Sequence, residues 1–226
     1  MKVLTRRFEW LGNALPNDEN TEDAGNATQT VNNGYLQLAM TNDSEAQIAG
    51  WNLGDANPFL ATRVLRARFW IEKVVDFDHA NCRLYFGLGT NHNVDIAAIA
   101  EHVAFGINGN NDDLIVRAQD GTNTLAETEI GITFEAGETR KFEINLADGL
   151  HANSPPVAQE GGRARCGFYL TNLFGEARKI NLGAARANIS AYNDGLQPFC
   201  FVRKADLTGV GTVRLHRVEV DWLAPN

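Results

Sequence analysis

The last strand-like stretch of the sequence carries two carboxylates in a pattern that could support acid–base chemistry. Glu219 and Asp221 stand two residues apart in V-E-V-D-W. Alternate residues of a strand point to the same side, so both are expected on one face. Retaining glycosidases use two carboxyls about 5 Å apart, and a strand with E-x-D-x-x-E would supply them. Ala224 stands where the final acid is needed, and we therefore predict no catalytic residues.

Other catalytic and metal-binding patterns are also missing from the sequence. None of its five histidines forms H-x-H or H-E-x-x-H, and neither a G-x-S-x-G elbow nor a P-loop occurs. These histidines are His79, His92, His102, His151 and His216. Asp76 and Asp78 offer oxygens that suit calcium, but such pairs on a loop are usually solvated. We predict no metal and no cofactor.

Three cysteines cannot all pair within one chain, and no C-x-x-C occurs among Cys82, Cys166 and Cys200. Cys166 and Cys200 lie in the apolar stretches ARCGFYL and PFCFV. This context favours buried free thiols, and a disulfide between the two stays open.

The segment 64–91 contains the clearest strand pattern of the chain. Apolar residues occupy alternate positions in LRARFWI and again in LYFGLGT, as in strands with one apolar face. If the two strands are antiparallel neighbours, parity allows a register that pairs Phe69 with Phe86 and Trp70 with Tyr85. The other face of the pair then carries Arg66, Arg68, Trp70, Arg83 and Tyr85.

That second face is the candidate ligand- or partner-binding surface of the sequence. Aromatic rings and arginines suit sugars, because the ring offers a stacking platform and the guanidinium donates bidentate hydrogen bonds. The same residue types are enriched at protein interfaces. A third interpretation is a cross-strand ladder covered by a loop of the same chain. All three stay open.

Composition and charge limit the class of protein. The 226 residues are 44% hydrophobic and 21% charged, as in ordinary globular domains. A net charge of -8 argues against a general nucleic-acid binder, since phosphate binding depends on clustered Lys and Arg. No apolar run approaches the roughly 18 residues of a membrane span, and the first residues lack a signal-peptide core. We expect neither nucleic acid nor membrane as a partner, and folding in a cytoplasm.

Short alternating strands separated by turn residues run through the chain, and helical spacing is weak everywhere. The stretch DIAAIAEH, which begins at Asp95, predicts one or two helical turns. Many strands without helical crossovers indicate an all-β, antiparallel two-sheet sandwich or jelly roll. We expect a single domain, 1–226, in which about residues 1–33 form an N-terminal anchoring segment and a polar loop.

The order of these segments resembles the concanavalin A-like (laminin-G-like) jelly roll. More narrowly, it is similar to the version found among structural proteins of tailed bacteriophages. The segments that carry the resemblance are FEWLGNAL, GYLQLAM, LRARFWI, LYFGLGT, AFGINGNNDDLIVRAQDG, TRKFEINLADG, GFYLTN, PFCFVRKA and VRLHRVEVDW. The chain departs from the pattern of this family at two places, which are the loop Leu150 to Gly162 and the long connection Leu173 to Gln197.

The resemblance implies a non-catalytic virion component, such as a capsid decoration, head-fibre or tail-associated protein. Its expected partners are other virion proteins of the capsid or tail, with a host-surface glycan as a further partner and homo-oligomers as the expected state. The expected location is the virion, after synthesis in the host cytoplasm. Because fold does not decide function, two alternatives remain: a lectin-like carbohydrate-binding module, and a glycoside hydrolase or polysaccharide lyase of the same fold.

Overall fold

The described part of the chain consists almost wholly of β-strands. The computed structural model describes residues 5–12, 21–56, 58–93, 95–109, 111–146, 166–171, 175–182, 187, 194–205 and 208–224. In this part the strands form two sheets, A and B, and the one helical element is a short 3-10 turn, η1 (Ile96–Ala98). The DIAAIAEH stretch thus contains a single turn, and its last two residues begin β9 (Glu101–Asn108).

Both sheets are antiparallel throughout the described pairs. Sheet A runs in the order β14 (Ala177–Lys179), β13 (Gly167–Thr171), β12 (Thr139–Asn145), β7 (Val64–Val75), β16 (Gly211–Leu223), β4 (Tyr35–Met40) and β3 (Thr28–Asn32), and β1 (Thr5–Leu11) also pairs with β16. Sheet B runs in the order β11 (Thr124–Thr133), β10 (Asp113–Asp120), β9 (Glu101–Asn108), β8 (Arg83–Gly89), β15 (Gly195–Lys204), β5 (Gln47–Trp51) and β2 (Thr21–Ala24), and β6 (Phe59–Leu60) also pairs with β15.

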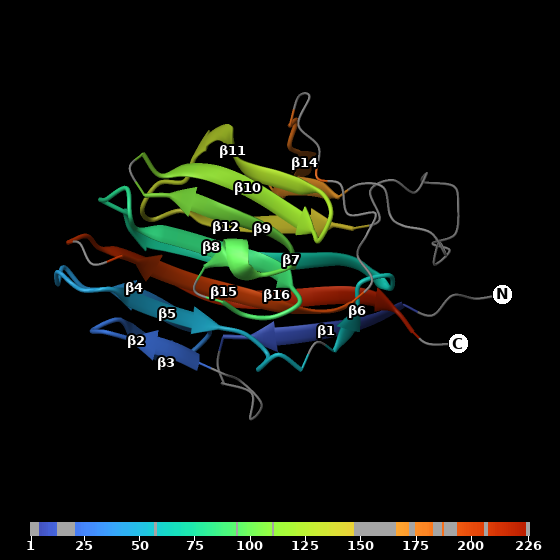
Figure 1. Cartoon of the computed structure of the whole chain (residues 1–226), viewed down its shortest axis with the longest axis horizontal. Coiled ribbons are helices and arrows are strands. Elements are labelled where there is room, and N and C mark those ends of the chain that lie inside the picture. Colours follow the sequence, from blue (N-terminus) through green and yellow to red (C-terminus); the bar gives the residue numbers. More distant parts are fainter. Residues whose placement is uncertain are drawn as a thin grey trace.

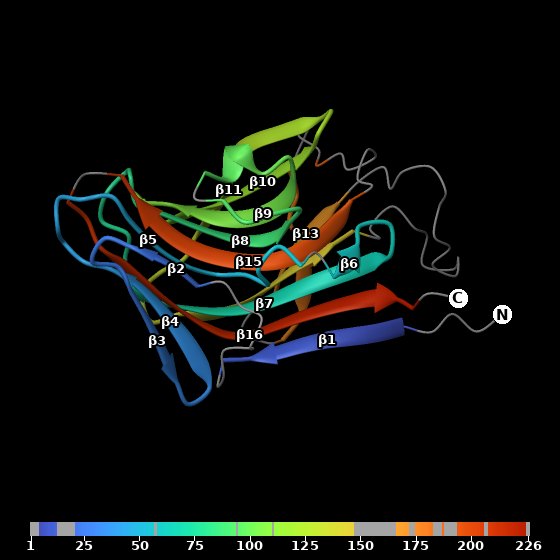
Figure 2. The ribbon, with the colours of Figure 1, turned by 60° about the horizontal axis from the view of Figure 1, so that its bottom comes forward.

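The two sheets lie face to face as layers of a sandwich (Figure 1). Figure 2 shows them nearly edge-on, with β8, β9 and β15 in one layer and β1, β7 and β16 in the other. Sheet B rises at both ends in this view, so its outer face is concave. The predicted antiparallel two-sheet sandwich is confirmed.

Alternation along the strands builds the core between the layers. In β7 the side chains of Ala67, Phe69 and Ile71 are fully buried, and in β8 the same holds for Leu84 and Phe86. Phenylalanines join the two layers, because Phe86 of sheet B lies 5.6 Å from Phe69 and 4.8 Å from Phe142 of sheet A, measured between ring centroids. The apolar face predicted for each strand therefore points inward.

The predicted pairing of β7 with β8 is wrong. The strand β7 pairs with β12 and β16 in sheet A, whereas β8 pairs with β9 and β15 in sheet B. Phe69 and Phe86 do meet, but across the core. Alternation fixes which side chains point inward, and it does not say whether the next strand lies beside the first or opposite it.

The chain between β7 and β8 therefore crosses from one sheet to the other. Phe77 and Cys82 of this crossing are buried in the core. Asp76 forms an ion pair with Lys73 at 2.8 Å, and Asp78 accepts a hydrogen bond from the Val210 amide at 2.7 Å. The two aspartates considered for calcium thus serve contacts within the protein. In the described residues no cluster of three His, Cys, Asp or Glu side chains is placed to hold a metal.

The segment predicted as a polar loop contains two short strands. β2 extends sheet B beside β5, and β3 extends sheet A beside β4. Their sequences, TEDA and TQTVN, have little apolar alternation. An edge strand can form without it, because backbone hydrogen bonds hold the strand to its neighbour; in β3 most side chains are exposed. The preceding strand β1 pairs along its whole length with β16, and Trp10 reaches into the core, 4.9 Å from Trp51 between ring centroids.

Cys82, Cys166 and Cys200 are buried and form no disulfide. Cys166 and Cys200 are not joined, which answers the question that the sequence left open. No helix in the described ranges has the length and apolar character needed to cross a membrane.

Candidate binding site on the concave face of sheet B

The outward-pointing side chains of β8 and β15 lie on the concave face of sheet B. In β15, Cys200 and Val202 face the core, so Phe199, Phe201 and Arg203 point outward. In β8 the outward set includes Arg83 and Tyr85. The register of the two strands places Arg83 directly opposite Arg203 and Tyr85 opposite Phe201.

A short segment of the same chain covers the apolar middle of this face. The turn η1 and the residue after it, Ile99, pack onto outward side chains of sheet B as a second apolar cluster. Its members are Ile48, Tyr85, Ile96, Ile99, Ala104, Ile115, Phe199 and Phe201. The short green coil of η1 is visible on the outer side of sheet B in Figure 2. The concave face is therefore partly occupied by the protein itself.

Polar contacts fix both ends of this covering segment. Asp95 caps η1 by accepting a hydrogen bond from the Ala97 amide at 3.0 Å. Behind the turn, His102 Nδ1 lies 2.8 Å from the carbonyl oxygen of Ile99. A carbonyl can only accept, so Nδ1 carries the proton. Burial lowers the pKa of His102 to about 4, and the ring is neutral at pH 7.

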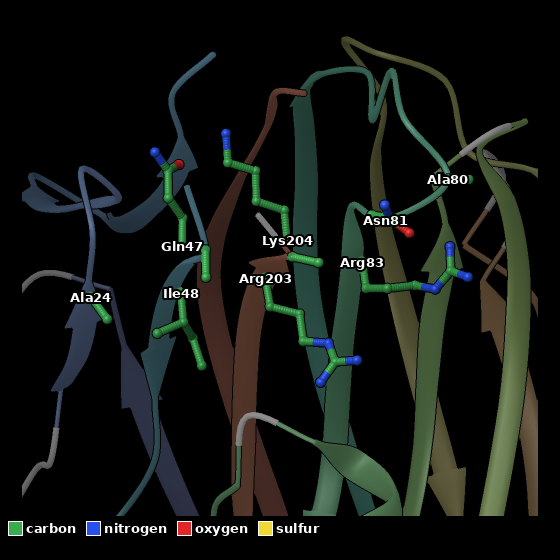
Figure 3. Close-up of a pocket in the computed structure, with 10 residues that line it drawn as sticks. Ala24, Gln47, Ile48, Ala80, Asn81, Arg83, Arg203 and Lys204 are labelled. Atoms are coloured by element: carbon green, nitrogen blue, oxygen red, sulfur yellow. The ribbon is translucent and has the colours of Figure 1, made fainter. Parts of the chain in front are cut away.

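Beside the covered region lies a pocket of about 400 Å³, drawn in Figure 3. It opens where β5, β8 and β15 approach the crossing between β7 and β8. The lining residues are Ala24, Ala46, Gln47, Ile48, Ala80, Asn81, Arg83, Arg203, Lys204 and Ala205. The volume is in the range of small-molecule sites.

The pocket wall is cationic, but its three basic residues are not equivalent. Figure 3 shows Arg203 and Lys204 pointing in opposite directions from β15. The ammonium of Lys204 is bound to the backbone carbonyls of Thr41, Asp43 and Gly209, and its role is to hold these loops. Arg83 and Arg203 are the cations that face the open side of sheet B.

Tyr85 lies beneath the surface of the concave face. Its side chain is buried, packs 5.6 Å from Phe201 between ring centroids, and donates a hydrogen bond to Glu127. Burial and this carboxylate raise the pKa of the phenol. The ring fits because its strand partner is Gly106, where a Cβ would lie 2.9 Å from Tyr85 Cδ1. Tyr85 is thus a buried support for the site and no exposed stacking platform.

The other three predicted site residues lie on the opposite side of the molecule. Arg66, Arg68 and Trp70 point outward from β7 and so belong to the outer face of sheet A. The structure does not bring them together with Arg83 and Tyr85, because β7 and β8 lie in different layers and their outer faces point apart. The single predicted surface is therefore divided into two.

An ion-pair network occupies the outer face of sheet A. Arg68 contacts Glu143 at 2.8 Å and Glu219 at 2.7 Å, and Arg66 contacts Asp221 at 2.7 Å. Trp70 is stacked by the cations of its neighbours, with Arg217 at 4.9 Å and Lys141 at 5.4 Å from the ring centroid. These contacts are made within the chain.

The two carboxylates of the last strand are partners in this network. Burial opposes the charge of Asp221, but hydrogen bonds from Arg7 and Arg66 outweigh it and lower the pKa of this carboxyl. Glu219 is 3% exposed and lies 2.7 Å from Arg68. A general acid requires a raised pKa, so the arginines around Asp221 oppose that role for this carboxyl.

Several residues of the pocket were not singled out from the sequence. Arg203 shares the parity of Phe199 and Phe201 in PFCFVRKA. The alternation of this stretch could therefore have indicated that the three side chains point to one face. Asn81 and Gln47 come from irregular or short segments, and only the tertiary structure places them beside β15.

Comparison with known proteins supports the fold. No family model matches the sequence, and no curated protein matches it. Solved structures do match over nearly the whole chain. Peanut lectin is 13% identical with a TM-score of 0.62, covering 99% of this chain and 100% of the lectin. A family 16 endo-glucanase from Bacteroides ovatus is 9% identical with a TM-score of 0.60, covering 94% and 99%.

A third match is the CBM2 module of the evolved Dit protein of Lactobacillus casei BL23 phage J-1. It is 12% identical with a TM-score of 0.58, and the alignment covers 100% of this chain and 99% of the module. Together these likenesses show the fold, which is that of a concanavalin A-like β-sandwich. Binding proteins and glycosidases both occur among its structural neighbours, and at these identities the likeness extends to the fold alone.

Proposed function

We propose that this protein is a non-catalytic carbohydrate-binding module whose site is the pocket on the concave face of sheet B. The observation that carries the proposal is the chemistry of the pocket wall. Arg83, Arg203 and Asn81 offer hydrogen-bond donors beside small apolar side chains, and none of the ten lining residues is a carboxylate. Glycoside hydrolysis uses two carboxyl groups at the sugar, so this wall suits binding better than turnover.

The carboxylates of Glu127, Glu219 and Asp221 do not alter the non-catalytic assignment. Glu127 accepts the Tyr85 hydrogen bond and lies 3.8 Å from Arg117. Glu219 and Asp221 lie in the arginine network of the other sheet. Since a catalytic pair must flank one bound sugar, carboxylates divided between the two outer faces cannot act together.

We further propose that the module is carried on a tailed-bacteriophage particle, where it contacts capsid or tail proteins as a homo-oligomer. The order of its segments supports this setting, and so does the full-length likeness to a module of a phage Dit protein. In this setting we assign protein contacts to the outer face of sheet A. Trp70 and the arginines around it are residue types enriched at interfaces.

Binding to an array of bacterial surface polysaccharides tests the proposed activity. We expect wild-type protein to bind and the Arg83→Ala/Arg203→Ala double variant to lose at least about ten-fold in affinity, because charge-assisted hydrogen bonds disappear. Arg6→Ala is the matched control, since Arg6 is an exposed arginine of β1 in the other sheet. Release of reducing ends from a bound polysaccharide would contradict the non-catalytic assignment, and absence from purified particles would contradict the virion setting.

A further inference from the structure

Two arginines of the pocket stand on neighbouring strands of sheet B. Arg83 and Arg203 are direct partners in the antiparallel pairing of β8 and β15, and both side chains leave sheet B on its concave side. Like charges in directly opposite positions destabilise a sheet pair. An arrangement of this kind is stabilised by an anion that contacts both guanidinium groups.

The hydrogen bonds of Arg83 all go to uncharged groups in the described part of the chain. Arg83 donates to Asn108 Oδ1 at 2.6 Å and to the Cys82 carbonyl oxygen at 3.5 Å, which are both uncharged acceptors. Arg203 Nη1 lies 3.9 Å from Asp95 Oδ1, beyond hydrogen-bond distance, and the Asp95 side chain is 57% exposed. The charge of Arg83 is therefore not balanced by a carboxylate in the described part of the chain.

Other pocket residues suit the remainder of a sugar. The side chain of Asn81 lines the pocket and makes no hydrogen bond within the described residues, so its amide is available to hydroxyl groups. Ala24, Ala46 and Ile48 line the pocket with apolar surface, which suits the C–H faces of a pyranose. A pocket with one cationic wall and one small apolar wall fits a saccharide unit that carries a charged substituent.

Asp95 marks where that substituent would bind. Its carboxylate approaches Arg203 from the η1 segment while Oδ1 caps the turn through the Ala97 amide. It thus contributes a weak internal anion at the edge of the pocket. A ligand anion that approaches Arg203 would be repelled by Asp95, so this aspartate competes with the ligand for the guanidinium.

We propose that the pocket selects anionic saccharides, with the acidic group of one sugar unit held between Arg83 and Arg203. This inference rests on the proposed carbohydrate-binding function and narrows its ligand class. The shared chemistry is an oxyanion on a sugar polymer. It comes from the carboxylate of a uronic acid or from the phosphate of a teichoic acid, and the two sources are separated by experiment.

The test measures dissociation constants of the full chain for polygalacturonate, a teichoic acid and neutral dextran, by calorimetry at low and high salt. We expect at least about ten-fold tighter binding of one acidic polymer than of dextran, since hydrogen bonds to charged groups are the stronger ones. This preference should shrink at high salt, because the pocket is open to solvent. The polymer that binds more tightly identifies the carboxylate or the phosphate as the source.

Four pocket variants and one control, Arg6→Gln, connect the preference to the pocket. Arg83→Gln and Arg203→Gln should each weaken acidic binding by about ten-fold, whereas Arg6→Gln should leave it unchanged. Arg203→Lys keeps the charge without the guanidinium fork and should retain part of the preference. Asp95→Asn should strengthen acidic binding a few-fold, because asparagine still caps η1 while the competing charge is removed. Circular dichroism confirms the fold of each variant.

Each result has a distinct meaning. Dextran binding equal to that of both acidic polymers, or acidic binding unchanged in both glutamine variants, would overturn the anion assignment and leave the carbohydrate-binding function standing. Absence of binding to all three polymers and to the polysaccharide array would overturn both.

Discussion

Lys73 is a charged residue at a core position of β7. Its position in β7 has the parity of the core residues Phe69 and Ile71, and its side chain is fully buried. The ammonium lies 2.8 Å from both Asp76 and Asp112. A buried charge without partners is costly. The two aspartates therefore compensate the buried ammonium of Lys73 at the end of the sandwich.

The two aspartates should differ in importance. Asp112→Asn should destabilise the fold by about 3 kcal/mol, the low end of the range for broken buried ion pairs, because Asp76 remains. Asn tolerates the left-handed backbone of this position, φ 54°. Asp76 is 51% exposed, so Asp76→Asn should lower the free energy of unfolding by less than about 1 kcal/mol. Urea denaturation of both variants measures the difference, and equal losses would contradict this account.

At the scale of elements, the η1 segment explains why the concave face is not an open groove. Ile96 and Ile99 insert into the apolar side chains of β8 and β15, and His102 binds the Ile99 carbonyl from below. The turn therefore behaves as a fixed part of the sheet surface. The end of the face beside Arg83 and Arg203 stays open as the pocket.

The buried ring of His102 should make stability depend on pH. Its pKa falls from 6.5 to about 4 on folding, so the unfolded chain binds the extra proton between these values and stability falls as pH is lowered through that window. From pH 7 to pH 5 the expected loss is about 2 kcal/mol. His102→Gln should remove this part of the loss, and His216→Gln, a partly exposed control, should retain it. Urea midpoints at the two pH values are the measurement.

Strand neighbours are the element-scale property that sequence patterns predicted poorly. Parity correctly identified the inward residues of β7 and β8, and Phe69 does contact Phe86. The assumption that consecutive strands pair side by side was wrong, because residues 76–82 carry the chain between layers. As a result, Arg66 and Arg83 lie on opposite outer faces, and only Arg83 belongs to the pocket.

At the scale of the whole molecule, a cluster of phenylalanines fastens the two sheets together. Phe86 is central, with ring neighbours Phe69, Phe105 and Phe142 between 4.8 and 5.6 Å away by centroid distance. Two of these neighbours belong to the opposite sheet. Because Phe86 belongs to β8, which carries Arg83, the cluster also packs against a strand that carries the pocket.

Truncation of the Phe86 side chain should lower the free energy of unfolding of the whole sandwich. Phe86→Ala should cost about 3 to 5 kcal/mol, because a large cavity opens between the sheets. Phe86→Leu keeps most of the volume and should cost clearly less. The urea midpoint should shift for all spectroscopic probes at once if the two sheets unfold as one unit. Separate transitions would contradict that view.

The sequence by itself determined the local features of this protein. Alternation predicted the strands and their inward faces, the lack of helical spacing predicted an all-β sandwich, and the turn at Asp95 was expected. Only the tertiary structure decided which strands are neighbours, and hence that Arg83 lies opposite Arg203 in the strand register while Arg66, Arg68 and Trp70 lie on the other sheet. The physical reason is that a side chain's direction depends on its own backbone, whereas a binding site depends on the register between strands far apart in the chain.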